Sequence, residues 1–303
     1  MPATAAHPSP HPSPHPSVFQ GYLAALGTVF IWAGFILISR LGGKTALTGW
    51  DIVALRLGTA SLVLLPFSLK LPPGTWRDKR LWTMALFGGL LFLVLVYAGF
   101  KRAPAAHGGI LLPGMQPFLV TALAWALMGA RPSRLRLFGL IPIAAGVACV
   151  AMPQILGAHQ GPGTLAGDAL LFGGSVAWAI YSVLVKKWAV DAWLLTRFVA
   201  LASCLVFMPV YLAFLPKGID QVPMSMLLLQ GLYQGLGPTI VAMLLFLRAV
   251  AILGAERTGA MVALVPVMAG LGAVPLLGEP LTGWLIAGLL LVSSGAFLSA
   301  RLK

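Results

Sequence analysis

Aromatic and hydroxyl side chains stand in the middle of two long apolar stretches, where few of them are expected. Trp32 lies in the first stretch, and Trp178, Tyr181 and Ser182 lie in the second. Aromatic rings stack on an apolar or aromatic solute, while indole N–H and phenol O–H groups orient a carboxylate or an amine. We therefore expect these four residues to bind a solute. Packing between helices is the alternative interpretation.

A glutamine stands between two prolines in another apolar stretch. Gln116 lies between Pro113 and Pro117. Each proline removes one backbone hydrogen bond and leaves carbonyl groups free to serve a ligand. The amide of Gln116 is thus a candidate solute ligand, with a hydrogen bond to a neighbouring helix as the equal alternative.

A third group of polar residues occupies the least apolar of the long stretches. Tyr233 and Gln234 are followed by Gly235, Gly237 and Pro238, which indicate a bend or an unwound turn. Transporters use such turns to expose backbone dipoles to a solute. We take Tyr233 and Gln234 as site candidates and add Tyr97, near the end of a separate stretch.

His107 could carry a proton, because histidine titrates near neutral pH. The preferred interpretation is a passive, hydrogen-bonded side chain at the start of a helix. Proton- and sodium-coupled carriers usually rely on a carboxylate within the membrane. Here the seven acids all fall at predicted helix ends or in loops, which favours uncoupled transport; they are Asp51, Asp78, Asp168, Asp191, Asp220, Glu256 and Glu279.

The composition indicates which kind of fold positions these residues. Of 303 residues, 59% are hydrophobic and 9% are charged, and the mean hydropathy is +0.94. Soluble domains carry about 25% charged residues, and about 20 apolar helical residues cross a bilayer. We expect an all-α integral membrane protein with ten transmembrane helices, at residues 18–39, 51–69, 81–100, 104–128, 135–152, 166–186, 192–214, 225–247, 256–277 and 282–300.

Lysine and arginine predict the orientation. With the N-terminus in the cytoplasm, thirteen of them fall in inside segments and five in outside segments, namely Arg40, Lys44, Lys101, Arg102 and Lys217. Cytoplasmic loops carry the excess of positive charge, so both termini are expected inside. The same placement explains the net charge of +13 by topology and lipid headgroups, with no nucleic-acid partner.

Residues 1–17 repeat His-Pro-Ser-Pro and have almost nothing apolar to bury, which predicts a disordered cytoplasmic tail. Its histidines are interpreted as solvated, and Cys149 and Cys204 show no metal or disulfide spacing, so no metal, cofactor or disulfide is expected. A periplasmic linker is expected at 153–165, between one repeat at 18–152 and another at 166–301.

The two halves of the chain align. Trp32-Ala33-Gly34-Phe35 matches Trp178-Ala179-Ile180-Tyr181 at an offset of 146, and Pro117 matches Pro266 at an offset of 149. At that second offset, Gly139 and Gly146 match Gly288 and Gly295, which favours close helix packing. Five helices is an odd number, so the second copy enters from the opposite side. Inverted repeats are a transporter architecture that opens a central site to each side in turn.

These features resemble the drug/metabolite transporter superfamily, in its ten-helix branch of two EamA-type repeats. The strongest stretch is Pro266 followed by Leu277-Gly278-Glu279-Pro280-Leu281-Thr282 and a glycine-spaced final helix. The first repeat departs from it, because Ala130 stands at the position of Glu279. The general look is closest to bacterial exporters of amino acids, including aromatic ones, and other metabolites.

The resemblance implies that helices 1, 3, 4, 6, 8 and 9 surround the site, so that Trp32 and Trp178 face one another. It implies a bacterial inner-membrane exporter of small neutral or zwitterionic metabolites, foremost aromatic or hydrophobic amino acids, by facilitated alternating access. Its partners would be the solute and membrane lipids, with no oligomer required. The apolar stretches contain no set of residues that could form a buried catalytic site, so an enzyme is not expected.

Two alternatives stay open. One is a proton-coupled metabolite or drug exporter. The other is a nucleotide-sugar or phosphorylated-metabolite exchanger, which should need cations facing the cavity, whereas Arg56 and Arg197 are expected near the rims of peripheral helices.

Overall fold

The computed structural model describes residues 17–72, 74–155, 161 and 163–301, and every regular element in this part of the chain is helical. The tail expected at 1–17 lies outside the described residues except for Ser17, and the linker expected at 153–165 is described in part. Eight helices are long and apolar enough to cross a membrane, and two shorter apolar segments complete ten spans. The expected all-α membrane fold is therefore confirmed.

We number the spans in chain order. They are α1 (Val18–Gly43); α2 (Gly49–Ser68); α3 (Lys79–Met84), η2 (Ala85–Leu91) and α4 (Phe92–Phe100) as span 3; α5 (Ala105–Gly109), η3 (Ile110–Gly114) and α6 (Gln116–Met128) as span 4; α7 (Arg134–Ile155); α8 (Thr164–Trp188); α9 (Ala192–Phe214); α10 (Met224–Leu228), η5 (Leu229–Tyr233), α11 (Gln234–Leu236), η6 (Gly237–Val241) and the first part of α12 (Ala242–Val262) as span 8; the rest of α12 with α13 (Val265–Leu277) as span 9; and α14 (Gly283–Arg301). Two short turns, η1 (Thr75–Arg77) and η4 (Ile219–Gln221), lie in loops.

One predicted helix end is wrong by more than four residues. Span 8 was expected to end at residue 247, before Arg248, but the helix continues to Gly254. Gly254 has a φ of 82°, which interrupts the helix there. Glycine adopts such an angle without the steric cost that a side chain adds. The helix therefore ends at the backbone break and not at the first charge.

Spans 3, 4 and 8 each contain wide π-helical turns. Pro113 lies in η3 and Pro238 in η6. Proline has no backbone N–H and clashes with the preceding turn, so the helix widens there. The bend expected around Gly235–Pro238 is thus present as a helical distortion. Such turns often occur at functional sites, and all four lie in spans of the central group.

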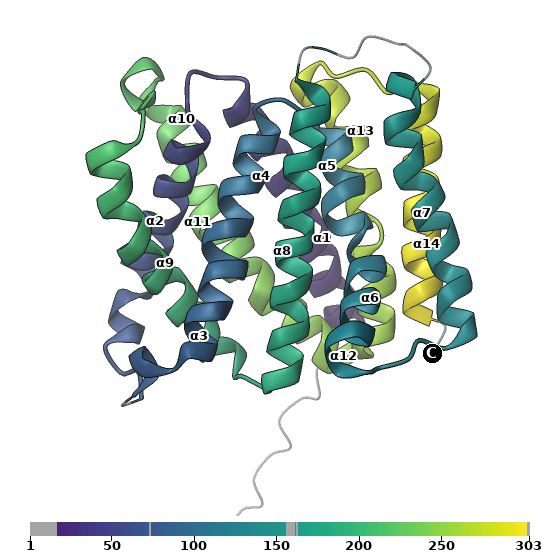
Figure 1. The fold of residues 1–303 in the computed structure, drawn as a ribbon, viewed down its shortest axis with the longest axis horizontal. Coiled ribbons are helices and arrows are strands. Elements are labelled where there is room, and N and C mark those ends of the chain that lie inside the picture. The colour runs from purple at the N-terminus through teal and green to yellow at the C-terminus, as the bar shows by residue number, and fades with distance from the viewer. Residues whose placement is uncertain (1–16, 73, 156–160, 162, 302–303) are drawn as a thin grey trace, which may run out of the picture.

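The main helix contacts follow the pseudo-symmetry that relates the two halves of the chain. Span 1 packs against spans 8 and 9, and span 6 packs against the equivalent spans 3 and 4. Spans 4 and 9, 2 and 7, and 5 and 10 pack against their own equivalents. Figure 1 shows α2 with α9 at one end of the molecule and α7 with α14 at the other. Spans 1, 3, 4, 6, 8 and 9 lie between them, as the family resemblance implied.

Local breaks repeat at the offset of 149 as well. A turn at Met115 precedes Pro117, and a turn at Leu264 precedes Pro266. Span 4 ends at Gly129 with φ 67°, and span 9 ends at Gly278 with φ 65°. Both glycines are in the left-handed region that commonly ends helices. The repeat seen in the sequence is therefore a repeat of backbone shape.

The glycines of spans 5 and 10 face each other. A Cβ atom on Gly288 would lie 3.0 Å from the carbonyl oxygen of Gly146, and one on Gly295 would lie 2.9 Å from that of Gly139. No side chain fits in this contact without displacement. The predicted close approach at these four glycines is confirmed.

Candidate substrate site between the repeats

A row of aromatic rings crosses the central spans. Phe35 of α1 stacks on Phe92 of α4 at 6.4 Å between ring centroids, Phe92 lies 4.9 Å from Trp178, and Trp178 lies 5.0 Å from Tyr181 of α8. Tyr97 of α4 meets Phe35 edge-on at 6.3 Å. We call these five residues the aromatic row. It brings together three predicted site residues, Tyr97, Trp178 and Tyr181, through two phenylalanines that the sequence analysis did not select.

The two predicted tryptophans have different aromatic neighbours. Trp32 packs against Phe246 of α12 at 5.5 Å, because α1 turns this face toward span 8. Among the described residues no ring contact joins Trp32 to Trp178. Trp32 and Trp178 are equivalent in the two repeats, but their rings do not contact each other as the resemblance had implied.

Two tyrosines occupy notches left by glycines in the partner repeat. A Cβ atom on Gly88 of η2 would overlap the ring of Tyr181, and one on Gly34 of α1 would overlap the hydroxyl of Tyr233. The Tyr233 hydroxyl also donates to the Ile31 carbonyl at 3.1 Å. Both tyrosines thus pack across the interface between the repeats. In this conformation Gly88 and Gly34 serve close packing.

Three glutamines donate across this interface and keep a free oxygen. Gln116 donates to the Ser175 hydroxyl at 2.9 Å, Gln234 to the Ser39 hydroxyl at 3.1 Å, and Gln230 to the Ile38 carbonyl at 2.8 Å. The Oε1 atom of each is buried without a partner among the described residues. A buried unpaired acceptor costs about 1–3 kcal/mol, so three of them together favour a ligand that donates.

Gln230 was not predicted as a site residue, although it lies one helical turn before Gln234. Ser182 was predicted in the site, but its hydroxyl donates to the Trp178 carbonyl of its own helix at 2.8 Å. Ser182 therefore reaches no other span through that bond.

Arg56 corrects an expectation. It was expected at the rim of a peripheral helix, but its Nη1 donates to the Tyr97 hydroxyl at 3.2 Å, and its guanidinium lies 5.2 Å from the Phe35 ring centroid. Among the described residues the three ion pairs involve other groups, and none includes Arg56. α2 packs on spans 3 and 8, and this face carries the residue inward. Position along a helix was readable from the sequence, but the direction of the side chain was not.

His107 of α5 pairs with Asp168 of α8. The distance from Nδ1 to Oδ1 is 2.8 Å, and the histidine is 1% exposed. Asp168 lies in the second turn of α8, where the sequence placed it at a helix end. The contact ties span 4 to span 6 and leaves both interpretations of His107 open.

Ionic and polar contacts join helix ends at one edge of the molecule, which is the upper edge in Figure 1. Arg40 pairs with Glu279 at 2.6 Å and donates to the Phe100 carbonyl at 2.8 Å. Glu279 accepts from the Ala105 backbone N–H at 2.7 Å, and Lys44 donates to the Leu277 carbonyl at 2.6 Å. We call Arg40, Lys44 and Glu279 the upper seal.

Lys101 supports this closed edge. Its ammonium donates to the carbonyls of Thr45 and Leu47 at 3.0 and 2.6 Å. Burial lowers the pKa of the Lys101 ammonium below its ordinary value. The loop after α1 is thereby tied to the loop after α4.

Comparisons with known proteins now identify the fold. The model of the EamA-like transporter family matches residues 19–152 and 165–301. The chain belongs to the EamA-like transporter family. It is 26% identical over 260 residues to the uncharacterized transporter YetK of Bacillus subtilis (strain 168), covering 82% of this chain and 77% of YetK. A solved structure described as "Crystal structure of protein" has a TM-score of 0.62 at 20% identity, over 93% of this chain and 98% of that one.

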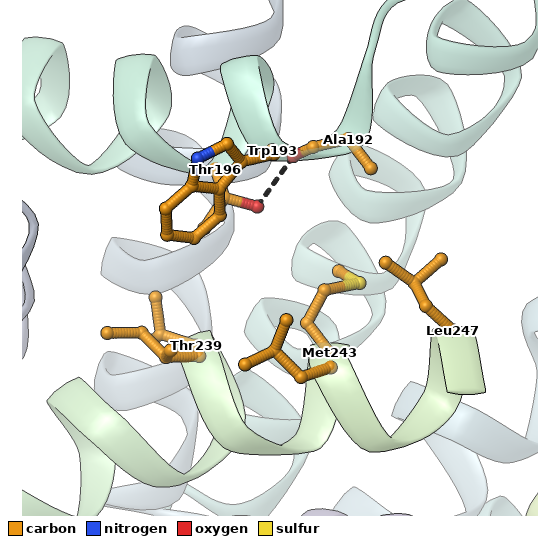
Figure 2. A pocket seen from close by; sticks show the side chains of 8 residues that line it. Ala192, Trp193, Thr196, Thr239, Met243 and Leu247 are labelled. Carbon is orange, nitrogen blue, oxygen red and sulfur yellow. Dashed lines mark hydrogen bonds between the residues drawn. The ribbon is translucent and has the colours of Figure 1, made fainter. Parts of the chain in front are cut away.

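This EamA-like transporter also has an apolar groove between α9 and α12, with a cavity volume of 120 Å³. Figure 2 shows Trp193 and Thr196 on one wall and Thr239, Met243 and Leu247 on the other. The Thr196 hydroxyl donates to the Ala192 carbonyl at 2.8 Å. The exposed lining is almost wholly apolar, because the hydroxyls of Thr196 and Thr239 donate to carbonyls of their own spans. The predicted site residues lie elsewhere.

Proposed function

We propose that this EamA-like transporter exports small neutral or zwitterionic metabolites, foremost aromatic or hydrophobic amino acids, across the bacterial inner membrane. Both termini are in the cytoplasm, and transport is facilitated alternating access. One observation carries the proposal: the aromatic row lies at the contact of the two repeats, where buried glutamine oxygens lack donors. Rings and amide oxygens suit a solute with an apolar side chain and an ammonium group.

The closed upper edge supports alternating access. The upper seal joins span 1 to the link between spans 9 and 10. A carrier with one edge closed by breakable polar contacts can open there when the other edge closes. The pseudo-symmetric helix contacts provide two equivalent arrangements of the halves.

The test is uptake into liposomes containing the purified full chain. Labelled phenylalanine, methionine, threonine and a neutral sugar are compared with and without an imposed pH gradient. We expect saturable phenylalanine and methionine uptake that ignores the gradient and falls at least tenfold in Trp178→Ala. Trp193→Ala is the matched control, because Trp193 is 38% exposed and lines the apolar groove between α9 and α12, away from the proposed site. Absence of amino-acid uptake by a folded protein would contradict the proposal.

A second candidate is proton-coupled export, favoured by the buried His107–Asp168 pair. In that case uptake would follow the pH gradient, and His107→Gln would remove this dependence while leaving exchange of solute for solute.

The orientation in the membrane is tested separately. A reporter that is active only in the periplasm is fused to the C-terminus, and an active reporter would contradict the proposed cytoplasmic C-terminus.

A further inference from the structure

We infer that Arg56 binds the carboxylate of a monocarboxylate solute, with the amide oxygens of Gln234 and Gln230 receiving its ammonium group. This inference rests on the proposed function and names a substrate class for the same site. It adds a charged residue to a site for which the sequence suggested only aromatic and amide groups.

The charge of Arg56 lacks a counter-charge. A cation within a membrane span is costly and is usually paired or functional. The described carboxylates that form ion pairs are Glu279, Asp78 and Asp168, and their partners are Arg40, Arg80 and His107. Asp51, in the same helix, accepts from Tyr211 and from the backbone of Thr48 and Gly218. An anionic ligand would supply the missing charge.

Hydrogen bonds on the two sides of Phe35 leave spare donors and a spare acceptor. Arg56 donates to the hydroxyl of Tyr97, whose ring meets that of Phe35 edge-on. Ser39 accepts from Gln234 and donates to the Phe35 carbonyl at 2.5 Å. A guanidinium has five N–H donors, and one is used in the described contacts. Spare donors thus lie on one side of Phe35 and the spare Gln234 oxygen on the other.

This polarity matches an amino acid. A carboxylate would accept from the Arg56 fork, in the bidentate geometry that guanidinium favours. An ammonium would donate to the unpaired oxygens of Gln234 and Gln230, both fully buried. Phe35 contacts the guanidinium as well as Phe92 and Tyr97 of the aromatic row, so an apolar side chain would lie along these rings.

A single cation favours a monocarboxylate over a phosphorylated metabolite. Five other basic residues lie toward the same edge, but each has a partner. Arg40 pairs with Glu279, whereas the other four, Lys44, Lys101, Arg102 and Lys217, donate to backbone carbonyls. A phosphate dianion would need at least one more free cation at the site.

Arg197, which opens span 7 as Arg56 opens span 2, provides the matched control. It is half-buried, donates to the Phe67 and Trp193 carbonyls, and lies 5.4 Å from the Trp193 ring centroid. Removing its charge changes a peripheral helix and leaves the central spans intact.

The experiment measures binding of labelled phenylalanine to the full chain in lipid nanodiscs. Phenethylamine, which lacks the carboxylate, and 3-phenylpropionate, which lacks the ammonium, are competitors. We expect Arg56→Gln to weaken phenylalanine binding about 10- to 100-fold, leave phenethylamine unchanged and abolish competition by 3-phenylpropionate. Arg197→Gln should match the wild type. An unchanged ratio of phenylalanine to phenethylamine affinity in Arg56→Gln would overturn the inference.

Failure of the proposed function has a different signature. If the wild type binds no amino acid, direct titration with 3-phenylpropionate, lactate and glucose 6-phosphate shows whether Arg56 binds a carboxylate of another solute. Binding of a monocarboxylate that needs Arg56 keeps the inference and removes the amino-acid proposal. Binding of the phosphorylated sugar alone, or of none of the three, overturns the inference. If Arg56→Gln does not fold, Arg56→Lys and Tyr97→Phe replace it; wild-type phenylalanine affinity in both would overturn the inference.

Discussion

At the scale of single residues, the site depends on polar groups that the fold leaves unsatisfied. The glutamine Nε2 donors are used to join the repeats, while the oxygens are left unpaired. An unpaired buried acceptor lowers the stability of the empty protein, and binding of a donor restores it. We therefore expect stability and transport to oppose each other at these positions.

Gln116→Leu tests this opposition. The change removes an unpaired oxygen, and Ser175 keeps its own hydrogen bond to the Leu112 carbonyl. We expect the protein to gain about 1 kcal/mol, or about 2 °C in melting temperature, while phenylalanine uptake falls severalfold. Thermal unfolding and liposome uptake measure the two effects. Thr196→Val, in the apolar groove between α9 and α12, should change neither the melting temperature nor the uptake. If Gln116→Leu lowers both the melting temperature and the uptake, Gln116 has a structural role.

The sequence indicated part of this site for a physical reason. Gln116 and Gln234 were predicted because polar side chains in mid-span need partners, and Tyr97 was added as a tyrosine near the end of a span. Arg56 and Ser39 were missed because charge and hydroxyl groups near helix ends are ordinary, and only the rotation of α1 and α2 turns them inward. Phe35 and Phe92 were missed because phenylalanine is unremarkable in any apolar helix.

At the scale of helices, the pairing of spans 5 and 10 is set by backbone contact. Gly288→Ala and Gly146→Ala each place a methyl group about 3 Å from a carbonyl oxygen of the other helix. We expect a loss of about 1–3 kcal/mol for each, because the helices must separate. Gly283→Ala is the control, since a Cβ atom there meets nothing within 4 Å. Thermal unfolding in detergent should separate the variants, and equal melting temperatures would contradict this packing argument.

Helix ends and pairings were predictable where they depend on strong local signals. Apolar length located all ten spans, and the repeated glycines predicted that spans 5 and 10 each pack closely on a neighbour, but not that this neighbour is the other of the two. The end of span 8 was misplaced because Arg248 can extend toward an interface from within a helix. The π-helical turn in span 3 had no proline to predict it.

The upper seal belongs to the same scale, because its contacts join the ends of spans 1, 3, 4 and 9. Glu279→Gln breaks the Arg40 pair and should favour opening of the upper edge. The reporter is Ser39→Cys in a chain without Cys149 and Cys204, because Ser39 is fully buried below the seal. We expect labelling by a membrane-impermeant maleimide to accelerate about tenfold, which corresponds to about 1.4 kcal/mol.

The control for that measurement is another ion pair. Asp78→Asn breaks the exposed Asp78–Arg80 pair in the loop between spans 2 and 3. An exposed pair contributes little, so labelling of Ser39→Cys should stay at its starting rate. Equal labelling in Glu279→Gln and Asp78→Asn would show that the pair does not hold the edge closed.

At the scale of the whole molecule, the two edges differ although the helix contacts are symmetric. Arg40 corresponds to Lys186 and Glu279 corresponds to Ala130, so the lower edge lacks the equivalent ion pair. One polar contact joins span 6 to span 4 there, from Lys187 to the Leu127 carbonyl at 3.2 Å, but these residues are not the repeat equivalents of Lys44 and Leu277. We therefore expect the conformation closed at the upper edge to be favoured.

Restoring the missing acid should reverse this preference. Ala130→Glu places a carboxylate where Lys186 can reach it, because span 4 packs against span 6 at this end. A new pair at the lower edge would favour the state that is open above, so labelling of Ser39→Cys should accelerate and net uptake should slow severalfold. Ala130→Gln has nearly the same size without the charge and should leave both rates unchanged. If Ala130→Glu also leaves them unchanged, the two edges are not exchanged by the repeat symmetry, and rocking of one repeat against the other would not describe this carrier.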